Sequence, residues 1–126
     1  MTRLFPTETR LLIADDDPGF RETVAMLLEP HVDTIVVESG EQAIAVVTSH
    51  TIDLALFDMH MPLLTGLEAF RVAREIRSEL PGILMTANLT DELEREAQAA
   101  DVYSVLRKPP TRDLLLDTIA GALQAS

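Results

Sequence analysis

Five short apolar runs, each followed by a longer amphipathic stretch, repeat along this chain, and this alternation constrains the fold more than any other feature. The apolar runs span residues 11–14, 32–37, 52–57, 82–85 and 102–106, and we interpret them as strands. Strands that are apolar throughout and separated by helices form a parallel sheet that is covered on both faces. Five repeats are too few for an eight-stranded barrel, so the sequence predicts an α/β fold with an open, doubly wound, five-stranded parallel sheet.

Capping residues mark the expected helix starts. Asp17 stands directly before Pro18, which is typical of an N-cap followed by the first helical position. Ser39 and Gln42 have the spacing of a capping box, and Thr90 precedes an acid-rich run, which favours the start of a helix. These signals and the spacing of apolar residues predict helices over about residues 18–28, 40–49, 66–79, 91–100 and 115–123.

The length of 126 residues suits one domain, and 47% hydrophobic with 25% charged residues argues against disorder. We expect residues 10–126 to form this single domain and residues 1–9 to be loosely ordered. No apolar run reaches the roughly 18 residues of a membrane span, and the N-terminus lacks the apolar core of a signal peptide. The sequence therefore predicts a cytoplasmic protein without a membrane segment.

The chain is strongly acidic, with 21 Asp and Glu residues against 10 Lys and Arg residues and a formal net charge of −11. Binding to a nucleic-acid backbone needs a cationic surface, so this balance argues against direct nucleic-acid binding. It suits a protein that binds a cation or a basic partner. The absence of cysteine excludes disulfides, zinc–thiolate sites and thiol nucleophiles.

Chemically versatile residues stand where the predicted strands end. They are Asp15, Asp16 and Asp17 after the first strand, Asp58 after the third, Thr86 after the fourth and Lys108 after the fifth. In an open α/β sheet the functional site lies beyond the carboxyl ends of the strands. One acid at a strand end is usually a helix cap, but several strand ends that together deliver carboxylates, a hydroxyl and an ammonium indicate a site.

Carboxylates that cluster repel one another, so they need a cation, a proton or the Lys108 ammonium in order to coexist. Oxygen ligands with room for water and phosphate suit Mg²⁺. A carboxylate beside Mg²⁺ and an ammonium, with a hydroxyl nearby, can accept a phosphoryl group, because the cations neutralise charge on the transferring oxygens. The residues by themselves thus indicate magnesium-assisted phosphoryl transfer.

Four motifs carry a family resemblance: LIADDDP at residues 12–18, DMHMPLLTG at 58–66, MTA at 85–87 and KP at 108–109. In this order and spacing they resemble the receiver domain of two-component response regulators, over essentially the whole chain. The resemblance implies a flavodoxin-like sheet with strand order 2-1-3-4-5. It also implies a signalling domain, not an enzyme, that takes a phosphoryl group from a sensor histidine kinase or phosphotransfer protein. The change then passes to an output domain or partner protein, and a homodimer is possible.

The resemblance also implies roles for the acidic residues. Asp58 is implied to be the phosphoacceptor. Asp16 is implied to bind Mg²⁺ directly and Asp15 mostly through water, and the backbone carbonyl of His60 and Asp58 itself complete the protein ligands. The side chain of His60 is interpreted as a solvent-facing loop residue rather than a metal ligand. Asp17 is interpreted as a helix cap rather than a third metal ligand.

Other motif residues carry implied roles, and one departs from the family pattern. Thr86 is implied to hydrogen-bond the phosphoryl group and to move with it, and Lys108 to pair with Asp58 and then with the phosphate. Pro109 commonly follows a cis peptide bond in the family. Three positions before the lysine, the family usually has an aromatic residue that turns inward. Val105 occupies this position here, so the predicted switch consists of Thr86 and Val105.

Three further departures lie outside the phosphorylation chemistry. The only tyrosine, Tyr103, stands two residues before Val105 and is predicted to share its face of the strand, displaced by about 7 Å. Asp101 stands where the family commonly has glycine, and Thr65 replaces the usual acidic or amide residue before Gly66. These residues bear on the output mechanism.

Two other functions are compatible with part of this pattern. A haloacid-dehalogenase-type phosphatase also uses a strand-end Asp-x-Asp pair, here Asp15 and Asp17, with a distant lysine. That reading leaves Asp58 unexplained and needs another acidic pair on a strand after Lys108, where the sequence predicts one helix. The other alternative is a degenerate receiver that acts only as an interaction module. The sequence leaves open whether the chain acts alone or is part of a longer protein.

Overall fold

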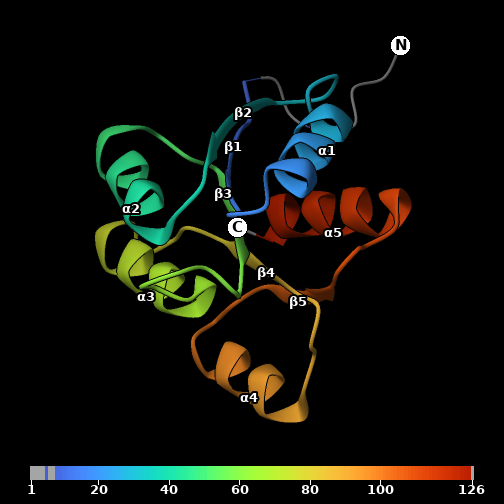
Figure 1. Cartoon of the computed structure of the whole chain (residues 1–126). Helices are drawn as coiled ribbons and strands as arrows, with labels where there is room; N and C mark the ends of the chain where they lie inside the picture. The colour runs from blue at the N-terminus through green and yellow to red at the C-terminus, as the bar shows by residue number, and fades with distance from the viewer. Residues whose placement is uncertain (1–4, 6–7, 126) are drawn as a thin grey trace.

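The strands form one parallel sheet in the order β2-β1-β3-β4-β5 in the computed structural model, which describes residue 5 and residues 8–125 (Figure 1). The strands are β1 (Arg10–Ala14), β2 (Asp33–Val37), β3 (Leu54–Asp58), β4 (Gly82–Thr86) and β5 (Ser104–Arg107). The helices are α1 (Pro18–Leu28), α2 (Gly40–Ser49), α3 (Gly66–Ile76), α4 (Asp91–Ala99) and α5 (Arg112–Ala125). This architecture confirms the predicted doubly wound α/β fold and its strand order 2-1-3-4-5.

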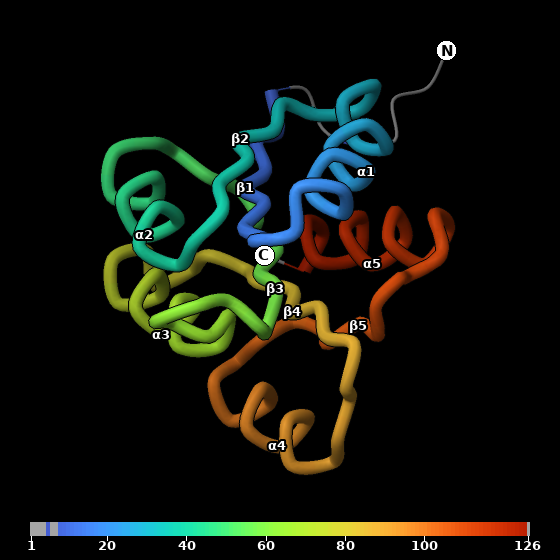
Figure 2. Tube along the Cα trace, viewed as in Figure 1, coloured from blue at the N-terminus to red at the C-terminus, as the bar shows by residue number. Residues whose placement is uncertain are grey.

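Two layers of helices cover the sheet: α1 and α5 lie on one face, and α2, α3 and α4 lie on the other (Figure 1 and Figure 2). Successive side chains of a strand alternate between these faces. Leu11 and Ile13 of β1 pack with α1 and α5, whereas Leu12 packs with the helices of the opposite layer. Every residue of the central strands β3 and β4 is buried, which explains why each strand is apolar except for its last residue, Asp58 or Thr86.

Capping side chains set the helix starts. Asp17, Ser39 and Thr90 cap α1, α2 and α4 as predicted, each accepting a hydrogen bond from a main-chain N–H of the first turn. The prediction missed a capping box at the start of α3. The Thr65 hydroxyl accepts from the Glu68 N–H at 3.1 Å, and the Glu68 carboxylate accepts from the Thr65 N–H at 2.9 Å. The T-x-x-E spacing is the signal that identifies it in the sequence.

Several boundaries differ from the prediction: α5 begins at Arg112 rather than at residue 115, and β5 begins at Ser104 rather than at residue 102. The turn after α4 contains Asp101 with a left-handed φ of 62°, and the Val102 N–H donates back into the helix at 3.0 Å. Aspartate tolerates this conformation better than most residues, so Asp101 serves where glycine is common. Helix α3 ends at Ile76 rather than at residue 79, because the next residue is extended.

Tyr103 lies before β5, and its ring reaches α5. A Cβ atom on Gly121 would come within 2.5 Å of the Tyr103 hydroxyl oxygen. Val105 instead packs with the cluster on the α2, α3 and α4 face. The prediction that Tyr103 and Val105 share one face is wrong, because alternation holds only within a strand and Tyr103 precedes it.

The start of the chain is described only in part. Phe5 is buried, and its ring meets the His31 ring edge-on with centroids 5.8 Å apart. Thr9 is buried directly before β1. For residues 1–4 and 6–7, the expectation of a loosely ordered N-terminal segment lies outside the described residues. None of the helices in the described part of the chain is long and apolar enough to cross a membrane.

Candidate functional site

The ends of four strands meet at one edge of the sheet and bring the predicted site residues together. The register of β1, β3, β4 and β5 brings their carboxyl ends to this edge. Asp58 and Thr86 are the last residues of β3 and β4, and Asp15 and Lys108 directly follow β1 and β5. The Lys108 N–H donates to the Thr86 carbonyl at 2.8 Å, so main-chain pairing between these two strands continues into the site.

Asp15, Asp16 and Asp58 form an acidic cluster in which one carboxylate oxygen from each residue lies within 4.8 Å of the others. Asp15 is 0% exposed and Asp58 is 4% exposed, whereas Asp16 is open to solvent. In the described part of the chain this is the one group of three acidic or histidine side chains that could hold a metal ion. Asp17 caps α1 and is not a member. Carboxylate oxygens at this spacing suit a hard cation.

Lys108 is the only lysine of the chain, and its ammonium contacts the cluster directly. Its Nζ lies 2.9 Å from Asp15 Oδ2 and 3.4 Å from Asp58 Oδ1, and the side chain is 16% exposed. The peptide bond between Lys108 and Pro109 is cis, as the resemblance implies. One ammonium against three carboxylates leaves a negative site, which favours binding of an additional cation.

The site changes the proton affinity of two of its groups. Burial raises the pKa of Asp58 above its ordinary value of 3.8, and the Asp15 charge raises it further, against the opposing effects of Lys108 and the His60 N–H. Burial alone would lower the pKa of Lys108, but the hydrogen bond to Asp15 and the charges of both carboxylates outweigh burial and raise it. Asp58 is therefore more basic than an ordinary aspartate, and Lys108 keeps its proton at neutral pH.

The loop after β3 lies close against Asp58. The His60 N–H donates to Asp58 Oδ1 at 3.3 Å, and the Gly66 N–H donates to the Met59 carbonyl at 3.1 Å. A Cβ atom at position 66 would lie 2.4 Å from the main-chain oxygen of Asp58, so glycine is required for α3 to begin this close to the site. The glycine of this motif therefore has a steric cause.

Thr86 is fully buried and already hydrogen-bonded. Its hydroxyl accepts from the Asn88 N–H at 3.1 Å and lies 3.1 Å from Nε2 of His60. The His60 ring is exposed, as predicted, but it also reaches across the site to Thr86, which the sequence analysis missed. These residues are 26 positions apart in the chain, and no local pattern relates them.

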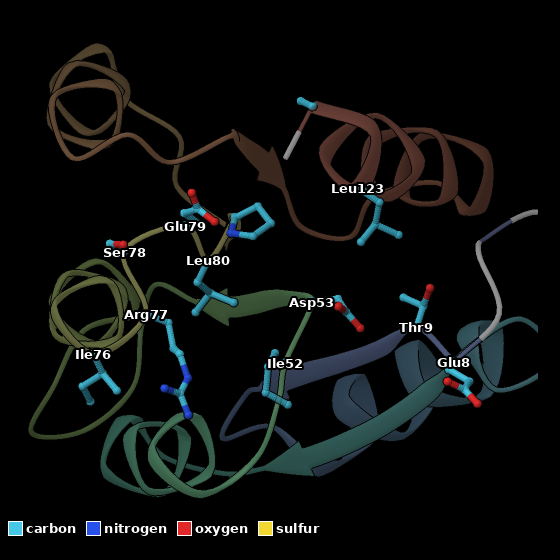
Figure 3. Close-up of a pocket in the computed structure, with 12 residues that line it drawn as sticks. Glu8, Thr9, Ile52, Asp53, Ile76, Arg77, Ser78, Glu79, Leu80 and Leu123 are labelled. Carbon is cyan, nitrogen blue, oxygen red and sulfur yellow. The ribbon is translucent and has the colours of Figure 1, made fainter.

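A pocket of about 1020 Å³ lies at the opposite edge of the sheet, near the amino ends of the strands (Figure 3). Its lining includes Asp53, Arg77 and Glu79, and it contains none of the predicted site residues. No group of three potential metal ligands lies there among the described residues. Its size therefore does not identify the functional site, whose chemistry lies at the acidic edge.

The response regulator receiver domain family matches residues 11–120 of the chain. The matched segment contains β2 to β5, all of β1 after its first residue, the acidic cluster and Lys108. The chain belongs to this family and is a receiver domain of the kind found in two-component response regulators.

Similar proteins agree with this assignment. The chain is 30% identical over 117 residues to the transcriptional regulatory protein GlrR of Escherichia coli, covering 92% of the chain and 26% of that protein. It is 32% identical over 109 residues to a response regulator receiver protein of Anaeromyxobacter, covering 86% of the chain and 46% of the relative. It is also 32% identical over 118 residues to the CAI-1 autoinducer sensor kinase/phosphatase CqsS of Vibrio cholerae, covering 90% of the chain and 17% of the relative. The chain thus spans less than half the length of these relatives.

Solved structures share the fold. A CheY-like receiver domain protein from Methanospirillum hungatei superposes with a TM-score of 0.90 at 24% identity, covering 94% of this chain and 96% of that one. The receiver domain of a response regulator, NarL, from Mycobacterium tuberculosis gives a TM-score of 0.88 at 23% identity, covering 96% of this chain and 100% of that one.

Proposed function

We propose that Asp58 accepts a phosphoryl group from the phosphohistidine of a sensor histidine kinase or phosphotransfer protein, with the help of Mg²⁺, and that this modification switches an output surface. The observation that carries the proposal is the convergence of three carboxylates and the only lysine of the chain at one sheet edge. Within the cluster, Asp58 is buried and its pKa is raised.

The residues present fit a magnesium ion. The three carboxylates offer hard oxygen ligands within 4.8 Å of one another, and their charge exceeds that of the one ammonium. Asp15, Asp16, Asp58 and the backbone carbonyl of His60 would hold the ion. When bound, Mg²⁺ supplies positive charge that offsets the negative charge on the phosphoryl oxygens.

Asp58, Lys108 and Thr86 have separate roles in the transfer of the phosphoryl group. A carboxylate oxygen of Asp58 attacks the phosphorus, the bond from phosphorus to the histidine nitrogen breaks, and its electron pair stays on the imidazole. Lys108 contacts Asp58 at 3.4 Å and is placed to pair with a phosphoryl oxygen as the carboxylate is consumed. The Thr86 hydroxyl, at the end of the adjacent strand, donates a hydrogen bond to another phosphoryl oxygen after leaving His60.

Uptake of phosphate tests this function. Incubation with a small acyl phosphate and Mg²⁺ should add one phosphoryl group per chain by intact mass, and none without Mg²⁺. Asp58→Asn should take up none, whereas Asp117→Asn, an exposed acid on α5, should behave as wild type. Equal labelling of Asp58→Asn would exclude Asp58 as the acceptor. Absence of uptake by wild type would favour the interaction-module alternative, and repeated turnover of a phosphate ester would favour the phosphatase.

A second prediction concerns the switch. Val105 is partly buried and stiff at χ1, so it cannot report movement of Thr86 as a large ring would. We expect beryllium fluoride, a mimic of the acyl phosphate, to change amide exchange in the loops after β3 and β4 and in α4, because His60 joins these loops through Thr86. β5 should change little in wild type, and Val105→Tyr should leave the loop response in place. A large change at β5 in wild type would contradict this.

The relatives suggest what the switch controls. They include transcriptional regulators and a sensor kinase/phosphatase, and each is much longer than this chain. We propose that the modified receiver acts through an output domain or a partner protein rather than through nucleic acid bound by its own surface, since its net charge is −11.

A further inference from the structure

Phe20 lies in the first turn of α1, and its ring lies against Lys108 of the site. It is not one of the residues that form the four family motifs. Its ring centroid is 4.1 Å from Nζ of Lys108. The ring is partly buried and packs against the core cluster shared by α1 and α5. An ammonium within about 6 Å of an aromatic ring centroid is attracted by the negative face of the ring. The lysine therefore has a third partner besides Asp15 and Asp58.

We propose that Phe20 is a positioning residue that holds the Lys108 ammonium between Asp15 and Asp58 and thereby sets the rate of phosphoryl transfer to Asp58. The effect on the rate rests on the proposed function, whereas the positioning of Lys108 by Phe20 does not depend on it. Lysine has a flexible four-carbon stem and a strongly hydrated charge, so its place in a site must be imposed by its surroundings. Two carboxylates and a ring face surround the ammonium and leave it little freedom.

The start of α1 gives the ring a defined position. The Asp17 carboxylate caps the helix by accepting from the Gly19 N–H at 3.1 Å. Arg21, the neighbour of Phe20, donates from its guanidinium to the main-chain oxygen of Asp15 at 2.7 Å. These bonds tie the first turn of α1 to the end of β1, so the ring and the Asp15 carboxylate are held in one local framework. Lys108 reaches this framework from β5 across the site.

The ring also limits access of water to the lysine. Lys108 is 16% exposed, and the aromatic face covers one side of its ammonium. A leucine at position 20 would keep much of the apolar volume but would offer no negative face, so the ammonium would gain water and additional rotamers. The Lys108 ammonium would then lie close to the incoming phosphoryl oxygens in a smaller fraction of the protein molecules, so phosphoryl transfer to Asp58 would slow.

Lysine-selective NMR tests the positioning directly, because the chain contains one lysine and labelled lysine gives one set of side-chain signals. In metal-free wild type, the protons next to the ammonium should be shifted upfield by the ring current of Phe20. The shift should disappear in Phe20→Leu and persist in Phe20→Tyr. Phe5→Leu, which removes a buried ring from the same core cluster, should leave it unchanged. Unchanged lysine signals in Phe20→Leu would overturn the inference.

Single-turnover phosphorylation by a small acyl phosphate tests the consequence. Phe20→Leu should lower the rate constant by about three- to tenfold, and Phe20→Tyr should restore it. In a Lys108→Met background, Phe20→Leu should have no further effect. Phenylalanine with increasing fluorination at position 20 keeps the ring shape and weakens its negative face, so the rate should fall stepwise even if the leucine variant folds poorly.

The two proposals fail separately. If wild type takes up no phosphoryl group, the proposed function is wrong, and the lysine signals still decide whether Phe20 positions Lys108. If wild type is phosphorylated but the rate is indifferent to fluorination and to Phe20→Leu, Asp58 remains the acceptor and the role of Phe20 is wrong.

Discussion

Lys108→Met should lower the free energy of unfolding of the metal-free protein by about 3 kcal/mol at neutral pH, the range found when one partner of a buried ion pair is removed. Asp15 and Asp58 are buried, and the ammonium lies 2.9 Å and 3.4 Å from their oxygens. Methionine keeps the length of the side chain but leaves both carboxylates without this cation. Urea denaturation of the two proteins gives the difference.

Two controls make this result specific. Arg107→Met removes an exposed positive charge from the adjacent position and should cost no more than about 0.5 kcal/mol. Asp58→Asn in the Lys108→Met background should recover much of the loss, because it removes one of the unpaired charges. The pKa of Lys108 is raised, so its contribution is complete below the ordinary value of 10.5 and is lost as the pH rises through the folded-state pKa. Equal effects of Lys108→Met and Arg107→Met would mean that the carboxylates do not depend on the ammonium.

The second large effect concerns Mg²⁺ and Asp58. In wild type, Mg²⁺ should add about 2.7 kcal/mol of stability at a hundredfold excess over its dissociation constant, since it binds only the folded protein. Asp58→Asn should raise the stability of the metal-free protein by about 1 kcal/mol, because it removes a buried charge and also relieves repulsion with Asp15. The two gains should not add, because the substitution removes a ligand together with a charge. Urea denaturation of both proteins with and without Mg²⁺ supplies the four values.

The direction of the pH dependence follows from the raised pKa of Asp58. Between the ordinary value of 3.8 and the higher folded-state pKa, the folded protein binds more protons than the unfolded chain. The Asp58 contribution to stability of the metal-free protein therefore falls as the pH rises through this window, and Asp58→Asn should lack that fall. A lower stability of metal-free Asp58→Asn, or no response of wild type to Mg²⁺, would mean that these carboxylates do not share a site.

Local signals in the sequence were enough to predict most of the fold. Apolar runs bounded by turns predicted the five strands, and the capping signals of Asp17, Ser39 and Thr90 predicted helix starts that the structure confirms. Boundaries that depend on a single backbone conformation were less predictable, as at Asp101, whose left-handed turn delays β5. Secondary-structure propensity is a property of a whole segment, whereas this turn depends on the two backbone dihedral angles of one residue, Asp101.

The sequence by itself determined which residues gather at the acidic edge, because parallel strands place their carboxyl ends together and Asp15, Asp58, Thr86 and Lys108 stand at those ends. Only the tertiary structure decided how these side chains are partnered. Lys108 lies closer to Asp15 than to Asp58 and rests on the ring of Phe20, contacts that join residues far apart in the chain and leave no periodic or local trace in the sequence. The distances between such side chains depend on how whole helices and strands pack, and packing is settled only when the complete core has formed.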